Sequence, residues 1–198
     1  DALIARIPGA LQRLVHGKDV EKRGTNHHAR GKWVVAEAMI PAGLLRSKLH
    51  VEAAELADLW AGAQLGFARV GTSNHAIQIA NGLSAMYIAT GQDAAYVSES
   101  VTATLSLEDH RGDLYATLDM PNLHAATVGG GTQKGTALEC QKLIGAKSAR
   151  ALACVFAATL LAGDINIAAS FVAGDFVGAH ERLGRNRQRI DAGDQRLG

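Results

Sequence analysis

In three short stretches of the chain, hydrophobic residues alternate with polar ones or β-branched residues are frequent. These stretches predict strands at residues 32–40, 101–107 and 113–120. The last two are separated by the polar segment 108–112, in which Gly112 can adopt the positive φ of a hairpin turn. The pattern therefore predicts a small sheet that contains one hairpin.

Elsewhere the hydrophobic residues recur at helical spacing. The predicted helices are residues 1–15, 43–49, 50–65, 75–89, 136–143, 148–161 and 165–171, with a last helical stretch from 176. Segment 75–89 is apolar on nearly all faces and is expected to be buried, with Ser73 or Asn74 as its cap. Gly163 is expected to end one helix and Asp164 to cap the next. The order of elements predicts an α+β fold, with central helices packed on a small mixed or antiparallel sheet.

Length and composition favour a single domain. The chain has 198 residues, 47% of them hydrophobic, which suffices for one sizeable core. We assign residues 1–190 to this domain and expect 191–198 to be a disordered tail. The formal charge of +1 gives no reason to expect a nucleic-acid partner. The longest apolar run, 151–162, is too short to span a bilayer, so no membrane segment is predicted.

The cysteines and histidines change this picture little. Cys140 and Cys154 both lie in apolar helical patterns, which predicts buried free thiols and fits a cytoplasmic location. His27 and His28 are adjacent, but no cysteine or carboxylate stands at ligand spacing from them. No metal site is therefore predicted.

Three segments contain residues that can carry chemistry. Asp93 follows the apolar segment 75–89, and an acid there is either a surface residue at a helix end or a group held by a cation. The run Gly129-Gly130-Gly131-Thr132 precedes a helix, where bare backbone amides can bind an anion or admit a flat ligand. His180 lies in a basic helical stretch. Alternatively, the glycine run is only a tight connection between elements, and His180 is an exposed histidine on a helix.

Five segments taken together resemble the class I 3-hydroxy-3-methylglutaryl-coenzyme A (HMG-CoA) reductases. They are Lys32–Ala42, Met86–Ala95, Asp113–Pro121, Thr127–Thr132 and Ala179–His180, and they occur in the family's order and at its approximate spacing. The resemblance covers roughly residues 30–187. It implies the substrate-binding half of that fold, with most of the small NADPH-binding domain absent from the chain.

The resemblance also implies an activity, which is the two-step reduction of HMG-CoA to mevalonate for isoprenoid biosynthesis, with NADPH and without a metal. It assigns a catalytic role to Asp93, which in the family couples to a lysine and a glutamate. It assigns His180 to the protonation of the leaving coenzyme A thiolate. Asn81, Gln78 and the run from Gly129 to Thr132 are implied to lie near the substrate. Because the family's site forms between two subunits, a homodimer is implied.

The chain departs from the family in its lysine loop. The family's Asp-Lys-Lys-Pro motif is replaced by the segment 17–24, which has no proline. Lys22 is the nearest match to the catalytic lysine, Lys18 is its rival, and Arg23 is expected to contact the substrate. The family's catalytic glutamate stands in an upstream segment that has no counterpart here. Gln78 stands where a histidine is usual.

These departures leave three interpretations open. The chain is part of an ordinary reductase, or a truncated homologue with a different reaction, or a non-catalytic dimeric binding protein. In the second case Asp93 and His180 are expected to act as an acid–base pair on an acyl, polyketide or isoprenoid substrate. Under both enzymatic interpretations, Asp93→Asn or His180→Gln is expected to abolish turnover while the fold stays intact.

Overall fold

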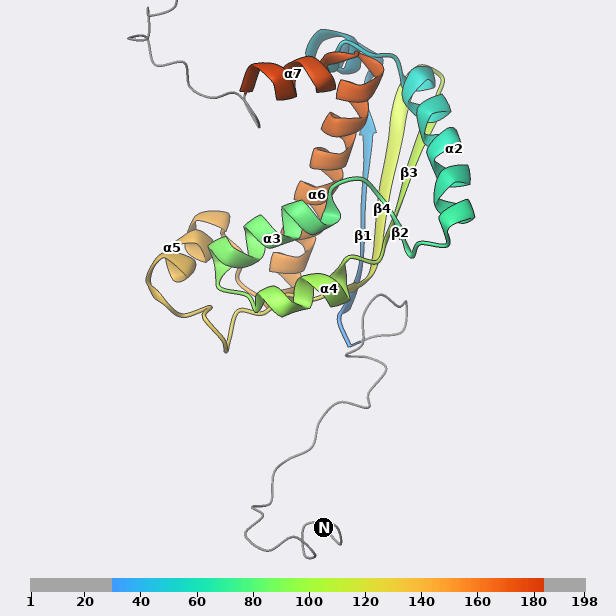
Figure 1. Cartoon of the computed structure of the whole chain (residues 1–198). Coiled ribbons are helices and arrows are strands. Elements are labelled where there is room, and N and C mark those ends of the chain that lie inside the picture. The colour runs from blue at the N-terminus through green and yellow to red at the C-terminus, as the bar shows by residue number, and fades with distance from the viewer. Residues whose placement is uncertain (1–29, 184–198) are drawn as a thin grey trace, which may run out of the picture.

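The computed structural model describes residues 30–183, and the structural statements below concern this part of the chain. Its elements are β1 (Lys32–Ile40), α1 (Ala42–Leu44), η3 (Leu45–Leu49), α2 (Ala53–Val70), β2 (Asn74–His75), α3 (Ile79–Thr90), η4 (Ala94–Tyr96), α4 (Val97–Ser100), β3 (Ala103–His110), β4 (Asp113–Leu123), α5 (Gly135–Ile144), α6 (Ala149–Val172) and α7 (Asp175–Leu183). Helices and a small mixed sheet share one hydrophobic core, so the predicted α+β fold is confirmed (Figure 1).

The four-stranded sheet has the order β1-β4-β3-β2. β4 pairs antiparallel with both β1 and β3, whereas the short β2 pairs parallel with β3. The predicted hairpin is confirmed, with positive φ at Arg111 and Gly112 in its turn. β4 does not stop at Pro121 as its sequence suggests. The register between β1 and β4 shifts between Lys32 and Val34, and this irregularity accommodates a proline that has no N–H to donate.

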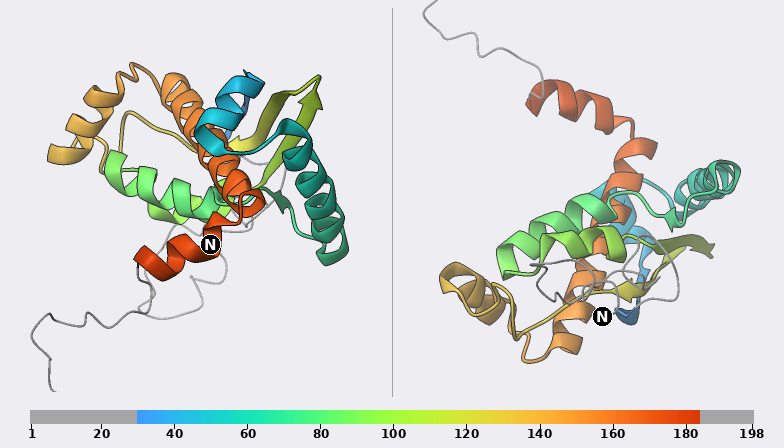
Figure 2. Two further views of the ribbon diagram at one scale, coloured as in Figure 1. Left: turned by 90° about the horizontal axis from the view of Figure 1, so that it is seen from above. Right: turned by 60° about the horizontal axis from the view of Figure 1, so that its bottom comes forward.

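The two longest helices, α2 and α6, cover one face of the sheet (Figures 1 and 2). α2 is fixed to β3 by Trp60, whose indole N–H donates to the carbonyl of Leu105 at 2.6 Å. Successive side chains of a strand point to opposite faces, so the outward residues of β1 lie on the other face. That face is open, and Trp33 on it is 74% exposed while Val35 and Met39 are about half exposed.

α6 is a single helix that continues through the expected break at Gly163 and Asp164. α3 crosses α6 so closely there that a Cβ on Gly163 would collide with the side chain of Gln78. The glycine therefore serves the helix crossing rather than a helix end. Asp164 is fully buried, and its carboxylate accepts the backbone N–H groups of Ile77 at 3.2 Å and Gln78 at 3.0 Å.

Asp164 thus binds the free N–H groups ahead of α3, a role that the sequence assigned to Ser73 or Asn74. α3 consequently begins at Ile79, later than predicted. Burial raises the pKa of Asp164, and the two backbone hydrogen bonds partly oppose this rise. The prediction that α3 is buried all round is wrong, because Asn81 and Ala85 are exposed and Ile88 is 76% exposed.

By length and composition alone, α6 is long and apolar enough to cross a membrane. Half of its most apolar window is buried, and it packs on β1 and β4. Core helices pass the same test, so this finding carries no argument for a membrane span. The prediction of buried thiols is wrong for Cys154, which is exposed on α6, while Cys140 on α5 is half-buried.

Candidate active site

Asp93 and the glycine run lie in one pocket. The pocket encloses about 270 Å³ and is lined by Arg30, Gly31, Lys32, Gly91, Gln92, Asp93, Tyr96, His124, Ala125, Ala126, Val128, Gly129, Gly130 and Thr132. We call it the Asp93 pocket. Three separate parts of the chain build it: the start of β1, the connection after α3, and the segment between β4 and α5.

The close approach of two backbones holds the glycine run against the end of α3. Gly91 ends the helix with φ of 69°, and a Cβ there would lie 2.5 Å from the carbonyl oxygen of Gly131. The side-chain amide of Gln141 donates to the carbonyls of Thr90 at 2.9 Å and Thr132 at 3.0 Å, which joins both segments to α5. The glycine run is therefore built into the fold rather than loosely attached.

Asp93 is exposed at the mouth of this pocket. Its Oδ1 accepts the backbone N–H of Ala95 at 3.0 Å and so caps the short helix η4. Lys32 lines the same pocket, with its ammonium group donating to the carbonyl of Ala125 at 2.8 Å. The pocket therefore contains a carboxylate and an ammonium group from different elements.

A cluster of charged and aromatic side chains forms one side of the Asp93 pocket. Arg30 donates to both carboxylate oxygens of the buried Glu99, each at 3.2 Å. The guanidinium carbon of Arg30 also lies 4.9 Å from the centre of the Tyr96 ring, and His124 stacks on that ring at 4.6 Å. Nε2 of His124 is 3.3 Å from Oε2 of Glu99. This is an ion-pair distance rather than a well-aligned hydrogen bond.

Burial and charge determine the protonation of this cluster. Desolvation lowers the pKa of His124; Glu99 opposes this shift, and Arg30 and Lys32 add to it. The hydrogen bond to Glu99 raises the pKa of Arg30, which keeps the guanidinium charged. Tyr87 lies behind the cluster and donates its hydroxyl to the His124 carbonyl at 2.6 Å. Burial raises the pKa of Tyr87 to about 12.

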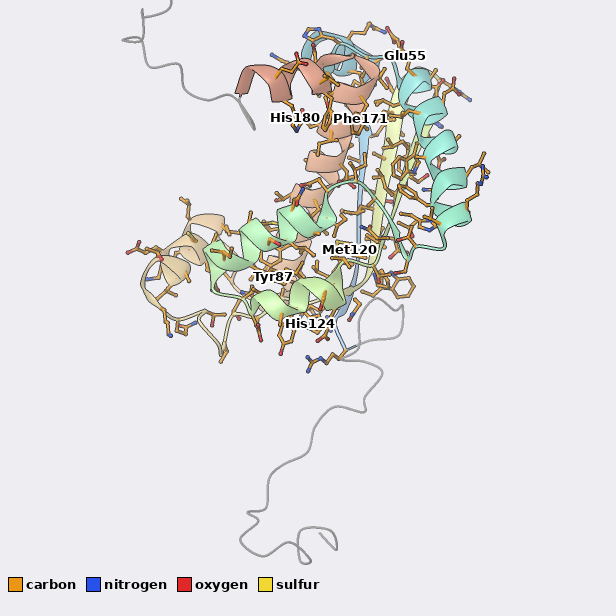
Figure 3. The ribbon with its side chains drawn as sticks, in the orientation of Figure 1. Glu55, Tyr87, Met120, His124, Phe171 and His180 are labelled. Carbon is orange, nitrogen blue, oxygen red and sulfur yellow. The ribbon has the colours of Figure 1, made fainter. Side chains whose placement is uncertain are left out.

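The other predicted residues lie elsewhere. His180 is on α7, where Nδ1 lies 2.8 Å from the carbonyl oxygen of Phe176 and the ring packs on the Phe176 ring at 4.2 Å. α7 packs against α6. The side chain of His180 lies on the side of α7 that faces α3 in Figure 3. Asn81 is exposed on α3, and Gln78 precedes that helix with its amide 3.4 Å from the carbonyl oxygen of Leu160. The structure thus joins Asp93 to the glycine run, while His180 does not line their pocket.

Three predicted residues, Lys18, Lys22 and Arg23, lie outside the described residues. The pocket is also lined by Lys32, Tyr96 and His124, to which the sequence assigned no role in the site. Nor did it single out Glu99, which binds Arg30 beside the pocket. His124 directly precedes the segment that leads to the glycine run, so its position was the available signal. The others come together only through the fold.

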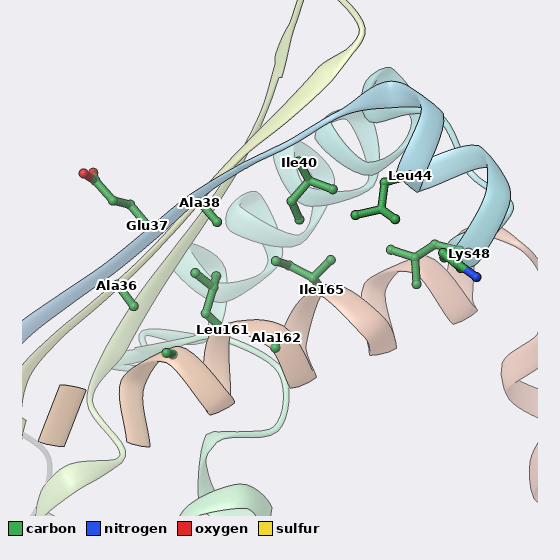
Figure 4. Close-up of a pocket in the computed structure, with 11 residues that line it drawn as sticks. Ala36, Glu37, Ala38, Ile40, Leu44, Lys48, Leu161, Ala162 and Ile165 are labelled. Atoms are coloured by element: carbon green, nitrogen blue, oxygen red, sulfur yellow. The ribbon is translucent and has the colours of Figure 1, made fainter. Parts of the chain in front are cut away.

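A larger cavity of about 410 Å³ lies between β1, η3 and α6 (Figure 4). Its lining is almost entirely aliphatic. Glu37 and Lys48 are the two charged residues that line it, and Glu37 points away from its centre. Across residues 30–183, no three histidine, cysteine, aspartate or glutamate side chains gather as metal ligands. The Asp93 pocket is therefore the better candidate for chemistry.

Comparison with known proteins identifies the family. Residues 17–185 match the family hydroxymethylglutaryl-coenzyme A reductase. The chain belongs to this family. Two similar relatives are archaeal 3-hydroxy-3-methylglutaryl-coenzyme A reductases. The protein from Aeropyrum pernix is 36% identical over 171 residues, and the one from Methanothermobacter thermautotrophicus is 32% identical over 160 residues.

The chain spans only part of these reductases. The matches cover 81% and 79% of this chain but 40% of each archaeal relative. A similar solved structure is the class II 3-hydroxy-3-methylglutaryl-CoA reductase from Streptococcus pneumoniae bound to NADPH in open conformations. It has 25% sequence identity and a TM-score of 0.58, with coverage of 74% of this chain and 43% of that one. Membership in the reductase family and the reductase fold are both shown.

Proposed function

We propose that this chain supplies the substrate-binding half of an NADPH-dependent HMG-CoA reductase site. The observation that carries the proposal is the joining of Asp93 to the glycine run in one pocket, in a chain that matches the reductase family. In this role Asp93 holds and polarises the group that faces the reacting carbonyl, through a neighbouring ammonium group. Lys22 and Lys18 remain candidates for that ammonium group.

The Asp93 pocket fits one end of NADPH rather than the whole molecule. Sites for complete small ligands typically enclose about 300–1,000 Å³, and this pocket encloses about 270 Å³. Gly129 and Gly130 are exposed and carry no side chain, so a flat ring can approach their backbone. NADPH supplies hydride when bound. The chain's own residues orient the ring and the carbonyl and exclude water between them.

The position of His180 supports a site shared between two subunits. α7 packs on α6, and His180 does not line the Asp93 pocket of its own chain. In a twofold dimer the same surface of each chain meets its mate, so His180 of one chain can approach Asp93 of the other. The exposed apolar residues Ile88, Phe171 and Val177 on α3, α6 and α7 provide surface for such contact. We therefore propose a homodimer.

The test is NADPH oxidation by the purified chain with HMG-CoA, together with NADPH binding by calorimetry. The wild type is expected to oxidise NADPH, and Asp93→Asn is expected to lose at least about a hundredfold in kcat. Asp58→Asn is the matched control, because Asp58 is an exposed acid on α2 away from the pocket. A folded chain that neither binds nor oxidises NADPH contradicts the proposal. Thioester turnover without NADPH oxidation favours the non-redox homologue instead.

A further inference from the structure

The proposed reductase chemistry does not use the most distinctive polar group of the Asp93 pocket. His124 lies in its wall with a side chain that is only 12% exposed. We propose that His124 exchanges a proton with the reacting oxygen of the substrate, and that Glu99 is its positioning residue. The inference rests on the proposed function for the identity of the reaction. It assigns to His124 a role separate from that of His180.

The surroundings of His124 fix its ring. Tyr96 stacks on the ring with an interplanar angle of 25°. Glu99 stands 3.3 Å from Nε2, and both oxygens of that carboxylate are held by Arg30. This contact is not aligned as a hydrogen bond, but a negative carboxylate at this distance favours a proton on Nε2 over a lone pair there. Nδ1 is then the nitrogen that takes up and releases a proton.

The same arrangement leaves Nδ1 available to a ligand. Within residues 30–183, no hydrogen bond to Nδ1 is formed. The backbone of His124 is fixed on both sides: its N–H donates to Ser100 at 3.1 Å, and its carbonyl accepts from Tyr87 at 2.6 Å. A histidine used only to fill space has no need of an oriented carboxylate, whereas an acid–base histidine does.

The charged and titratable groups around His124 come from three elements. Glu99 on α4 favours the imidazolium, whereas Arg30 and Lys32 at the start of β1 disfavour it. Tyr96 of η4 and Asp93 beside it line the same pocket. Desolvation, together with Arg30 and Lys32, outweighs Glu99 and lowers the pKa of His124, so the imidazole is predominantly neutral at pH 7. It is therefore poised to accept a proton in the oxidative direction and to donate one, once protonated, in the reductive direction.

When bound, NADPH would be the two-electron reductant: hydride would pass to the carbonyl carbon, NADP⁺ would remain, and the C=O π electrons would move to oxygen. The N–H bond at Nδ1 of the imidazolium breaks while an O–H bond forms at that oxygen, which leaves neutral imidazole and an alcohol. In the reverse direction neutral His124 accepts the same proton as hydride leaves carbon. No metal or further reactant is required.

The first measurement is the titration of the histidine rings of the full chain by NMR, with the His124 signal assigned from His124→Gln. His124 is expected to titrate below the ordinary value of about 6.5. In Glu99→Gln its pKa is expected to fall further, since the negative charge that favours imidazolium is gone. Saturating NADP⁺ is expected to shift it again. The inference is overturned if His124 does not titrate between about pH 4 and 9. It is also overturned if neither Glu99→Gln nor NADP⁺ changes the pKa of His124.

The second measurement is the pH dependence of NADPH oxidation with HMG-CoA. His124→Gln is expected to lower kcat by about 10²–10⁴-fold and to remove the loss of rate above the His124 pKa. Glu99→Gln is expected to shift that inflection to lower pH, which a merely structural role does not predict. His110→Gln, at the exposed end of β3, is the control.

The two measurements separate this inference from the proposed function. If the wild type binds and oxidises NADPH but His124→Gln keeps its rate and pH profile, the reductase proposal stands and the role of His124 falls. If the folded wild type binds neither NADP⁺ nor NADPH, the reductase proposal fails and the inference fails with it. Circular dichroism of both variants shows whether a lost rate reflects a lost fold.

Discussion

Asp164 connects two helices that are far apart in the sequence. Its carboxylate lies in the middle of α6 and accepts the N–H groups of Ile77 and Gln78 ahead of α3. Asp164→Ala is expected to destabilise the fold by about 2–4 kcal/mol, because two N–H groups lose their acceptor and a small cavity opens. Asp164→Asn keeps one acceptor oxygen and is expected to cost less. Urea unfolding followed by circular dichroism measures both. Equal costs for the two variants would contradict the role of the acceptor.

Asp164 also predicts a pH dependence of stability. Burial raises its pKa in the folded chain above the unfolded value of about 3.9. The folded state therefore binds more protons than the unfolded state between these two pKa values, so this group's contribution to the unfolding free energy falls as pH rises through that window. The stability advantage of wild type over Asp164→Asn is expected to be largest near pH 4 and to shrink toward pH 7. If the stability advantage of wild type grew with pH instead, the pKa of Asp164 would be lowered on folding and not raised.

At the scale of elements, the end of α3 and the glycine run form one unit. Gly91 and Gly71 have nearly equal φ angles, 69° and 68°, at the ends of α3 and α2. A Cβ on Gly91 would lie 2.5 Å from the backbone of Gly131, while a Cβ on Gly71 would meet nothing within 4 Å. Gly71→Ala is expected to cost about 1 kcal/mol for the strained φ alone. Gly91→Ala is expected to cost about 1–3 kcal/mol more.

The measurement for this pair is urea unfolding together with NADPH binding. Only Gly91→Ala is expected to weaken binding, because the glycine run must move away from the new methyl group. Similar losses of stability in both variants would mean that the glycine run moves away from the new methyl group at no energetic cost. Similar losses of binding would mean that the Asp93 pocket is not where NADPH binds.

Local patterns predicted the elements better than the contacts between them. The strand 32–40 and the hairpin turn at Gly112 follow from alternation and glycine placement. The expected break at Gly163 is absent, since this glycine makes room for the crossing of α3 over α6. Helix propensity alone cannot show that a second helix crosses there. The pairing of Arg30 with Glu99 and the stacking of His124 on Tyr96 depend on chain folding over long separations. For the same reason the sequence could single out Asp93 and the glycine run, but not the side chains that surround them in the pocket.

At the scale of the whole molecule, a shared site predicts complementation. Asp93→Asn and His180→Gln chains are each expected to be inactive as homodimers. If Asp93 of one chain acts with His180 of the other, a mixed dimer contains one site with both changes and one site with neither. Unfolding and refolding an equal mixture is then expected to restore about one quarter of wild-type NADPH oxidation, since half of the dimers carry one intact site. Light scattering checks the dimer, and no recovery would place both residues in one chain's site.

The open face of the sheet makes the chain its own optical reporter. The chain has two tryptophans, and the structure sets them in opposite environments. Trp60 is 4% exposed beneath α2, whereas Trp33 is 74% exposed on β1. Emission from Trp33 is therefore open to quenching by iodide, while Trp60 becomes accessible only when the core opens. Any molecule that covers the β1 face will shield Trp33 without changing Trp60, so one quenching experiment separates assembly from unfolding.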